Sequence, residues 1–593
     1  MARNKYNIDE ELDAPFNWVH IRRSLHYVKK YKFNFLKAFL CSITSALLGL
    51  LTPLITKLVI DKYIPQKNVK AILLLGICFL AIIVVIVLCN RMRSKLNVRN
   101  GQSIISDMRS DLFIHLQKLP FDYYDSRPHG KILVRVINYI NSVADFLSNG
   151  LINSILELLN LVFIVCYMLI VSPKLTLVVL SGLPIFAVYV MITKPLQRKS
   201  WQRYANKQSN TTAYLAENIN GAKTTKAFTR EHFNEEIFDG LLEETRSNYM
   251  RAIYIIQGMW PVTAFLSRLV TISIYLAGVY IFRDSITVGT IVAMAGYAGR
   301  FWGPIQNLGN IYNNLLNTAA YLERIFQVLD EPVTVTDIAG AAEMRRIKGS
   351  VIFDHVVFEY EKDQPVLKDV SFKVSEGQSI ALVGPTGAGK STIINLLSRF
   401  YNLKSGTVSI DGQDISNVTL HSLRKQMGIM LQDTFIFSGT IIDNIRYGRL
   451  DATDEECIEA AKTVHAHEFI SKLPKGYYTE VKERGEGISA GQKQLISFAR
   501  TLLSDPKILI LDEATSSIDT HTERMVQSGI QELLKNRTSF IVAHRLSTIK
   551  NCTRIMYIDG GEIAESGSHS ELIIKKGLYW QLYMSQLNDG VCV

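Results

Sequence analysis

The chain contains 593 residues, of which 48% are hydrophobic and 20% are charged, and its formal net charge is +11. This length exceeds one hydrophobic core, so we expect two or more domains, and the positive mean hydropathy of +0.13 indicates membrane-embedded segments. The 36 glycines and 15 prolines are ordinary numbers that exclude disordered and fibrous classes. Residues 1–340 hold 36 basic and 23 acidic residues, a net charge of +13, which fits the cytoplasmic loops of a membrane protein better than a nucleic-acid surface. We therefore expect no nucleic-acid partner.

Six apolar stretches in the first half are long enough to cross a bilayer, because a spanning helix needs about 20 apolar residues. The stretches are Ala38–Thr56, Ala71–Cys89, Phe146–Ser172, Leu175–Thr193, Ala252–Phe282 and a mixed segment from Ser285 that ends near Leu322. They predict an α-helical transmembrane domain with six spans over residues 1–330.

The loops between these stretches predict the orientation. Basic residues gather before the first span, after the second and after the fourth, which places all three on one side, and that side should be cytoplasmic. The N-terminus and the C-terminal domain would then be cytoplasmic, with the chain in the cell membrane. Two long connections on this side, Arg91–Asp145 and Lys194–Arg251, have helical spacing and predict stalks that reach about 40 Å into the cytosol.

In the second half of the chain, the apolar residues recur with a different spacing. Residues 331–348 contain Pro332 and Gly340 and read as a linker, and residues 349–590 alternate short β-like runs with helical stretches. The runs include Ser379–Val383, Ile508–Leu511 and Ser539–Ala543. This alternation predicts an α/β domain with a largely parallel sheet.

A phosphate-binding motif follows the first of these runs. Gly384, Pro385, Thr386, Gly387, Ala388, Gly389, Lys390, Ser391 and Thr392 match GxxxxGK[ST] between a strand and a helix, which is the context that the motif requires. The glycines let backbone N–H groups surround phosphates, Lys390 places a charge on the β- and γ-phosphates, and the Ser391 hydroxyl is a ligand for Mg²⁺. The motif predicts a P-loop NTPase domain that binds ATP and Mg²⁺.

Two carboxylates end the run Ile508–Leu511. Asp512 would reach Mg²⁺ directly or through water, and Glu513 would polarise the attacking water as the general base. A strand that ends in Asp-Glu is a weak signal alone and becomes strong beside a phosphate loop.

With these motifs, the second half resembles the nucleotide-binding domain of an ATP-binding cassette (ABC) transporter. The resemblance implies that Tyr360 stacks on adenine, that Gln432 contacts Mg²⁺, and that His544 holds the γ-phosphate. It also identifies Ile488–Gln492 as the signature motif, in which Ser489, Gly491 and Gln492 would contact nucleotide. Asp519 would lie in a loop that contacts the opposite subunit. The loop Glu483–Gly485 is similar to the segment that touches the coupling helices.

The first half resembles the six-helix membrane domain of multidrug-type ABC exporters. Phe121–Gly130 and Glu217–Glu231 resemble the two coupling-helix regions. The order of domains implies a half-transporter that needs a second chain, either the same or paralogous. The signature departs from LSGGQ at Ile488 and Ala490 while Glu513 is intact, and this favours a heterodimer slightly over a homodimer.

The function that the resemblance implies is ATP-driven export of hydrophobic or amphipathic compounds. Lipid flipping or export and peptide export use the same architecture and remain alternatives, although no protease-like domain precedes Ala38. An importer or a regulator with an inactive ATPase is disfavoured, because the ATPase motifs are intact and both domains share one chain.

Two charges lie well inside the apolar stretches and at the same expected depth. Glu157 lies 15 residues before Ser172, at the outer end of the third stretch, and Arg268 lies 15 residues before Arg283, at the outer end of the fifth. Each should face a partner or a wet cavity, because a charge in hydrocarbon is costly. A mutual ion pair is the favoured interpretation. The alternatives are that Glu157 faces the transport cavity and attracts cationic cargo, or that the side chains snorkel to the interface.

Overall fold

The computed structural model describes residues 18–126, 129–282, 285–361, 363–430, 434–482, 485–512, 520–542 and 549–589. The chain divides into two compact units. The first unit comprises residues up to Gln117 together with His129–Glu331, and the second comprises Lys118–Pro128 together with Pro332 onward.

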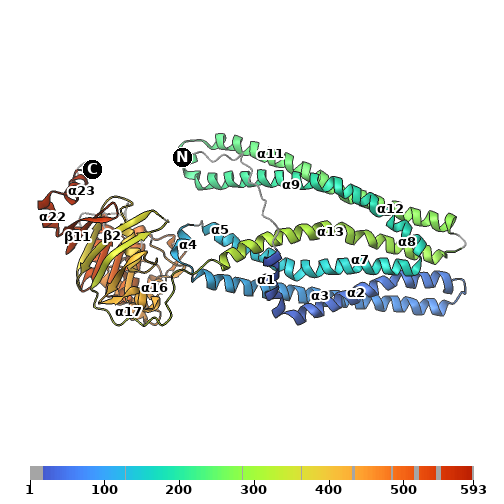
Figure 1. Cartoon of the computed structure of the whole chain (residues 1–593), viewed down its shortest axis with the longest axis horizontal. Helices are drawn as coiled ribbons and strands as arrows, with labels where there is room; N and C mark the ends of the chain where they lie inside the picture. Colours follow the sequence, from blue (N-terminus) through green and yellow to red (C-terminus); the bar gives the residue numbers. More distant parts are fainter. Residues whose placement is uncertain are drawn as a thin grey trace. The chain divides into compact units, whose positions relative to one another are not determined.

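All the regular secondary structure among the described residues of the first unit is helical (Figure 1). Its longer helices are α1 (Trp18–Lys30), α2 (Lys32–Leu58), α3 (Val69–Leu116), α7 (Leu151–Val171), α9 (Gly182–Asn220), α11 (Glu231–Gln257), α12 (Met259–Leu276) and α13 (Val288–Leu329). Shorter segments join them: η1 (Val59–Tyr63), α5 (His129–Val134), η2 (Arg135–Tyr139), α6 (Ile140–Asp145), η3 (Phe146–Gly150), α8 (Pro173–Leu180), α10 (Ala222–Ala227) and η4 (Ala277–Ile281). Helix α2 packs against α3, α9 against α11, and α13 against both α2 and α7.

Five helical segments among the described residues are long and apolar enough to cross a membrane. They are Lys32–Tyr63, Val69–Leu116, Ile132–Val171, Pro173–Asn220 and Glu231–Ile281. They cover the first five predicted spans except for Ser172 and Phe282, the last residues of the third and fifth. The sixth predicted stretch folds as α13, a continuous helix of 42 residues, but α13 is not one of the five. Glycine, asparagine and arginine residues interrupt the apolar character of α13, so hydropathy alone does not establish a sixth span.

The two long connections are helical, as their spacing predicts. Helix α3 runs without a break over 48 residues from the second apolar stretch to Leu116. Helices α9 and α11 lie side by side and cover most of the second connection (Figure 1).

The second unit contains a six-stranded sheet in the order β12-β11-β3-β10-β9-β6. Its strands are β3 (Ser379–Val383), β6 (Met427–Met430), β9 (Ile508–Asp512), β10 (Thr538–Val542), β11 (Arg554–Asp559) and β12 (Glu562–Gly567). All neighbouring strands are parallel except β11 and β12. The expected α/β architecture with a largely parallel sheet is therefore present and fits a P-loop NTPase.

An antiparallel sheet in the order β2-β1-β4-β5 completes the main framework. It contains β1 (Val351–Glu359), β2 (Pro365–Val374), β4 (Ser405–Ile410) and β5 (Gln413–Asp414), and a small ribbon joins β7 (Gly439–Thr440) to β8 (Glu480–Val481). The helices among the described residues of this unit are α4 (Phe121–Asp125), α14 (Lys390–Leu397), α15 (Leu420–Arg424), α16 (Ile441–Arg446), α17 (Asp454–Thr463), α18 (His467–Ile470), α19 (Ala490–Leu503), α20 (Thr520–Leu534), α22 (His569–Lys575) and α23 (Leu578–Asp589). The 3₁₀ turns are η5 (Ile415–Asn417) and η6 (Gly476–Tyr478).

The central strands read as continuous apolar runs because both faces of the parallel sheet are covered. In β3, Ile380 and Leu382 enter one core cluster, whereas Ala381 and Val383 enter the other. Strands β9 and β10 alternate between the same two clusters. This sandwiched sheet holds the phosphate loop and the acidic strand end at fixed positions.

Candidate nucleotide-binding site

The strands that carry the predicted motifs end at one edge of the sheet. Val542 of β10 pairs with Leu382 of β3 on one side and with Asp512 of β9 on the other. Met430 of β6 pairs with Leu511 of β9. Since these strands are parallel, the phosphate loop that follows β3 and the Asp512 carboxylate lie at the same carboxyl edge, where ligands bind in open α/β sheets.

The phosphate loop depends on glycine at two positions. Gly384 has φ +143°, and a Cβ there would lie 2.1 Å from the Ile558 carbonyl oxygen. Gly389 has φ +106° and forms the N-cap of α14, where a Cβ would lie 2.7 Å from Leu367. Glycine tolerates this left-handed backbone, so the loop can turn sharply and direct its N–H groups at a ligand.

Lys390 begins α14 and folds back over the loop. Its Nζ donates to the carbonyl oxygens of Gly384 at 2.9 Å and Pro385 at 2.8 Å. Burial lowers the pKa of the Lys390 ammonium, and the charge of Asp512 opposes that shift. A buried ammonium held at the mouth of a glycine loop suits the phosphates of a nucleotide.

The loop leaves several predicted contact residues accessible. Pro385, Thr386, Gly387 and Ser391 are exposed, whereas Ala388 and Thr392 are buried under the loop. Ser391 therefore presents a hydroxyl at the start of α14, while Asp512 is half-buried at the end of β9. These are the oxygen donors that Mg²⁺ prefers, and Mg²⁺ in such sites takes most of its remaining ligands from phosphates and water. Within the described ranges, no group of three or more His, Cys, Asp and Glu residues could hold a metal by itself.

Tyr360 lies beside the phosphate loop, at the end of β1. Its hydroxyl is 3.2 Å from the Thr392 hydroxyl, and its ring meets those of Phe358 and Tyr401 edge-on at 4.8 and 5.1 Å between centroids. Tyr360 is 43% exposed, so its ring is partly accessible to a ligand.

The signature residues form the start of α19. The Ser489 hydroxyl accepts from the Gln492 N–H at 3.3 Å, and the Gln492 side chain accepts from the Ser489 N–H at 3.1 Å, which is a capping box. Ser489 and Ala490 are exposed, and Gly491 is buried. The first turn of α19 thus presents backbone N–H groups at an exposed helix N-terminus.

Four of the predicted site residues, Gln432, Glu513, Asp519 and His544, lie outside the described residues. Glu483 of the predicted coupling contact does so as well. The described strands β6, β9 and β10 end immediately or shortly before Gln432, Glu513 and His544 in the sequence.

Helix α4, from the first predicted coupling region, belongs to the same unit as the phosphate loop. The Phe121 ring packs on Phe400 with centroids 4.2 Å apart, and Asp125 accepts a 2.6 Å hydrogen bond from the Tyr401 hydroxyl. Sequence reasoning missed Phe400 and Tyr401. The aromatic pair that follows α14 was the available signal, but nothing in its spacing indicates a docking role.

The buried-charge prediction for the first unit is wrong in its favoured form. Glu157 accepts a 2.9 Å hydrogen bond from the Asn307 amide of α13. Arg268 is exposed, and no ion pair joins these two described residues. Equal depth along two helices does not fix the direction in which each side chain points.

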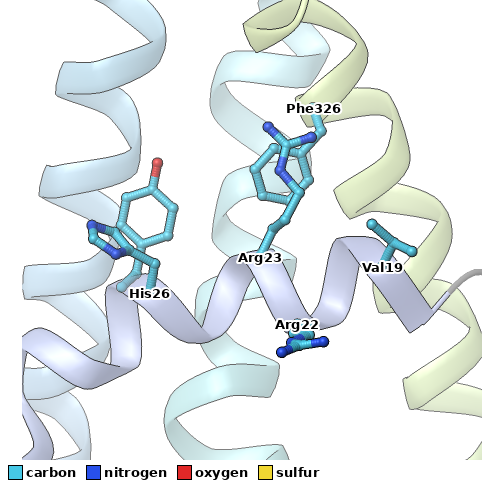
Figure 2. A pocket seen from close by; sticks show the side chains of 6 residues that line it. Val19, Arg22, Arg23, His26 and Phe326 are labelled. Carbon is cyan, nitrogen blue, oxygen red and sulfur yellow. The ribbon is translucent and has the colours of Figure 1, made fainter.

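A surface pocket of about 540 Å³ lies in the first unit between α1 and α13. It is lined by Val19, Arg22, Arg23, His26, Tyr27 and Phe326. Figure 2 shows the Arg23 guanidinium against the Phe326 ring, 4.1 Å from its centroid, while Arg22 points away. Arg23 also pairs with Asp330 at 2.6 Å, so this contact fastens α1 to the end of α13.

Two family models match the chain, the ABC transporter transmembrane region over residues 35–305 and the ABC transporter domain over residues 367–516. An uncharacterized ABC transporter ATP-binding protein of Bacillus subtilis, YknV, is 42% identical over 595 residues, which covers 100% of this chain and 98% of that protein. A putative multidrug export ATP-binding/permease protein of the same organism, YgaD, is 36% identical and covers 95% and 99% of the two chains. A fatty acid ABC transporter ATP-binding/permease protein of Mycobacterium tuberculosis is 38% identical, covering 81% and 76%.

The structure of a bacterial Atm1-family ABC exporter with ATP bound matches with a TM-score of 0.78 and 29% identity. The match covers 94% of this chain and 98% of that one. The chain belongs to the ABC transporter family as a half-transporter with a fused membrane domain and ATPase domain. It is membrane-embedded and is an exporter whose ATPase domain binds ATP and couples ATP hydrolysis to transport.

Proposed function

We propose that the protein exports hydrophobic or amphipathic compounds across the cell membrane as a dimer of half-transporters. The observation that carries this proposal is the fusion of apolar spanning helices to a phosphate loop and an acidic strand end at one sheet edge. The relatives named for multidrug export and for fatty acid transport support an apolar or amphipathic cargo. The N-terminus and the ATPase domain are cytoplasmic in this proposal, because the basic loops lie on their side.

In the ATPase site, Lys390 and the loop N–H groups bind the phosphates, and Tyr360 stacks on adenine. Ser391, Asp512 and Gln432 hold Mg²⁺, which when bound neutralises charge on the β- and γ-phosphates. Glu513 accepts a proton from the attacking water, and His544 contacts the γ-phosphate. Ser489, Gly491, Gln492 and Asp519 contact nucleotide held by the second chain.

The second chain is either another copy of this protein or a paralogue. The signature of this chain departs from LSGGQ at Ile488 and Ala490, while its Glu513 is intact. This combination favours a paralogue, because a partner chain that lacks its own catalytic glutamate could depend on Glu513 of this chain. Purification with and without co-expressed paralogues, followed by mass measurement, distinguishes the two assemblies.

Lipid export is the second candidate function. The fatty acid transporter that is 38% identical over 81% of this chain supports it. A fatty acid is itself an amphipathic compound, so the two candidates differ in cargo and share one transport mechanism.

The test is Glu513→Gln in the full chain, reconstituted in lipid nanodiscs. The amide keeps the shape of the side chain and loses its basicity, so ATP hydrolysis should fall by roughly 10²–10⁴-fold while binding of a fluorescent ATP analogue persists. Glu532→Gln is the matched control, because it makes the same change at a partly exposed residue of α20 and should leave hydrolysis unchanged. Near-normal hydrolysis in Glu513→Gln would remove this residue from the mechanism.

A further inference from the structure

Helix α13 exposes a stripe of small and polar residues where a lipid-facing helix would expose apolar ones. Gly296, Gly299, Arg300, Gly303 and Asn307 are all exposed, at spacings of three or four residues along one side. A Cβ added to Gly299 or Gly303 would meet no atom within 4 Å. Since α13 begins at Val288, these residues lie about 12–28 Å along its axis, within the ~30 Å depth of a hydrocarbon core.

Helix α3 provides the contrast within the same unit. Its early turns expose Leu73, Leu74, Ile77, Leu80 and Val84, as expected of a surface that faces lipid tails. A guanidinium is unfavourable in that environment, because a full charge in hydrocarbon is costly. The stripe on α13 therefore faces water or protein, not lipid.

Arg300 is held in place by a defect in the neighbouring helix. Pro53 in α2 has no N–H, so the Gly49 carbonyl loses its donor four residues on. Nη1 of Arg300 donates to that carbonyl, and Nη2 donates to the Thr52 hydroxyl at 3.1 Å. The guanidinium has five N–H groups, so these two bonds orient it without using all of its donors.

Arg300 has no acidic neighbour along the stripe. The described stripe from Gly296 to Asn307 contains no acidic residue, and Glu157 reaches it only at Asn307, seven residues or about 10 Å along the axis. The oriented donors and the exposed head of Arg300 match the geometry of a carboxylate, which an arginine fork binds with two parallel hydrogen bonds.

We propose that the α13 stripe lines the aqueous part of the transport pathway and that Arg300 binds the carboxylate headgroup of an amphipathic cargo. This inference rests on the proposed export function and narrows its cargo to amphiphiles with one carboxylate. The alkyl chain lies against the apolar side chains of the neighbouring helices, and the headgroup stays in contact with water along the glycines.

The test compares three probes that share a twelve-carbon chain: dodecanoate, dodecyltrimethylammonium and dodecanol. Equilibrium binding of each labelled probe is measured without ATP on the full-length protein in phosphatidylcholine nanodiscs. ATP-dependent uptake of the same probes into proteoliposomes is measured separately. Binding reports on the Arg300 site, and uptake reports on export, so failure of one is distinguishable from failure of the other.

The variants separate the cargo role of Arg300 from its support of α2. Arg300→Gln removes the charge and also weakens the contact with Gly49. The double variant Pro53→Ala, Arg300→Gln restores the missing main-chain donor for Gly49, so α2 keeps its hydrogen bonds while the charge is absent. Arg268→Gln is the matched control, because Arg268 is also an exposed arginine within an apolar stretch but belongs to α12 and lies outside the α13 stripe.

We expect the wild type to bind dodecanoate more tightly than the other two probes. The double variant should lose about 10-fold to 100-fold in dodecanoate affinity, with dodecanol binding unchanged, while Arg268→Gln retains wild-type selectivity. Three results would each overturn the inference: no dodecanoate preference in the wild type, unchanged dodecanoate affinity in the double variant, or an equal loss in Arg268→Gln. Dissociation of the dimer in the double variant with dodecanoate affinity retained would show instead that the stripe packs against a second copy.

Discussion

The hydroxyl of Tyr401 donates a 2.6 Å hydrogen bond to the carboxylate of Asp125, although 276 positions separate these residues in the chain. Burial and this hydrogen bond both raise the pKa of Tyr401, so the hydroxyl stays protonated and remains a donor at physiological pH. With the packing of Phe121 on Phe400, it attaches α4 to the unit that carries the phosphate loop.

Tyr401→Phe should weaken coupling between cargo binding and ATP hydrolysis. The change removes one hydrogen bond to a carboxylate and keeps the ring, so α4 should lose roughly 1–2 kcal/mol of docking free energy. We expect basal ATPase activity to stay near the wild-type value and its stimulation by cargo to fall, as measured in nanodiscs. Tyr478→Phe is the control, because Tyr478 also bonds an aspartate, Asp454, on another part of the same unit. Equal stimulation in wild type and Tyr401→Phe would show that α4 docks without this bond.

Two glycines of the phosphate loop should respond differently to alanine. Both have positive φ, but a Cβ at Gly384 would lie 2.1 Å from the Ile558 carbonyl oxygen, whereas a Cβ at Gly387 meets no atom within 4 Å. Gly387→Ala should therefore cost about 1–2 kcal/mol of backbone strain alone. Gly384→Ala adds a steric clash with backbone, for a further ~1–3 kcal/mol.

The measurement is the affinity for a fluorescent ATP analogue together with the thermal unfolding temperature of the full chain. We expect the order wild type, Gly387→Ala, Gly384→Ala in both quantities, each lower than the one before. If Gly384→Ala binds the analogue as tightly as Gly387→Ala and unfolds at as high a temperature, the loop relaxes away from β11 without an energetic cost.

An ion pair between β1 and β2 predicts a pH effect on stability. His355 Nδ1 lies 2.6 Å from an Asp369 carboxylate oxygen, and the hydrogen bond and the aspartate charge raise the pKa of His355 above its ordinary value. The stabilisation is therefore fully present below the unfolded pKa, about 6.5, and is lost as pH rises through the higher folded pKa.

Thermal unfolding of wild type and Asp369→Asn between pH 5.5 and about pH 8.5 tests this expectation. The wild-type advantage over the variant should be largest at the acidic end and should shrink as pH rises, because neutral His355 loses its charge attraction to Asp369. An advantage that grows with pH would contradict the raised pKa.

The local parts of the ATPase site were predictable, because each has a sequence period or a fixed spacing. The run that becomes β3, the glycines around Lys390 and the carboxylate at the end of β9 are defined within a few residues. The Tyr401–Asp125 bond has no such pattern, since it depends on how segments far apart in the chain fold together.

In the membrane domain, too, the sequence predicted local features but not contacts between distant segments. Five spans were readable from hydropathy, but the residues that make α13 distinctive, such as Arg300 and Asn307, also lower its hydropathy. Depth along the helix suggested Arg268 as the partner of Glu157, and the structure shows Asn307 instead. Rise per residue gives depth only, whereas contacts also depend on rotation about each helix axis.

The capping box at Ser489 has a consequence for the timing of dimer closure. Because the Ser489 and Gln492 side chains already fix the first turn of α19, the N–H groups at that end are ordered in the folded single chain. The proposed encounter with nucleotide on the second chain would then need no disorder-to-order transition here. Preorganisation of this kind lowers the entropic penalty of association, so more of the interaction free energy is available to draw the two ATPase domains together.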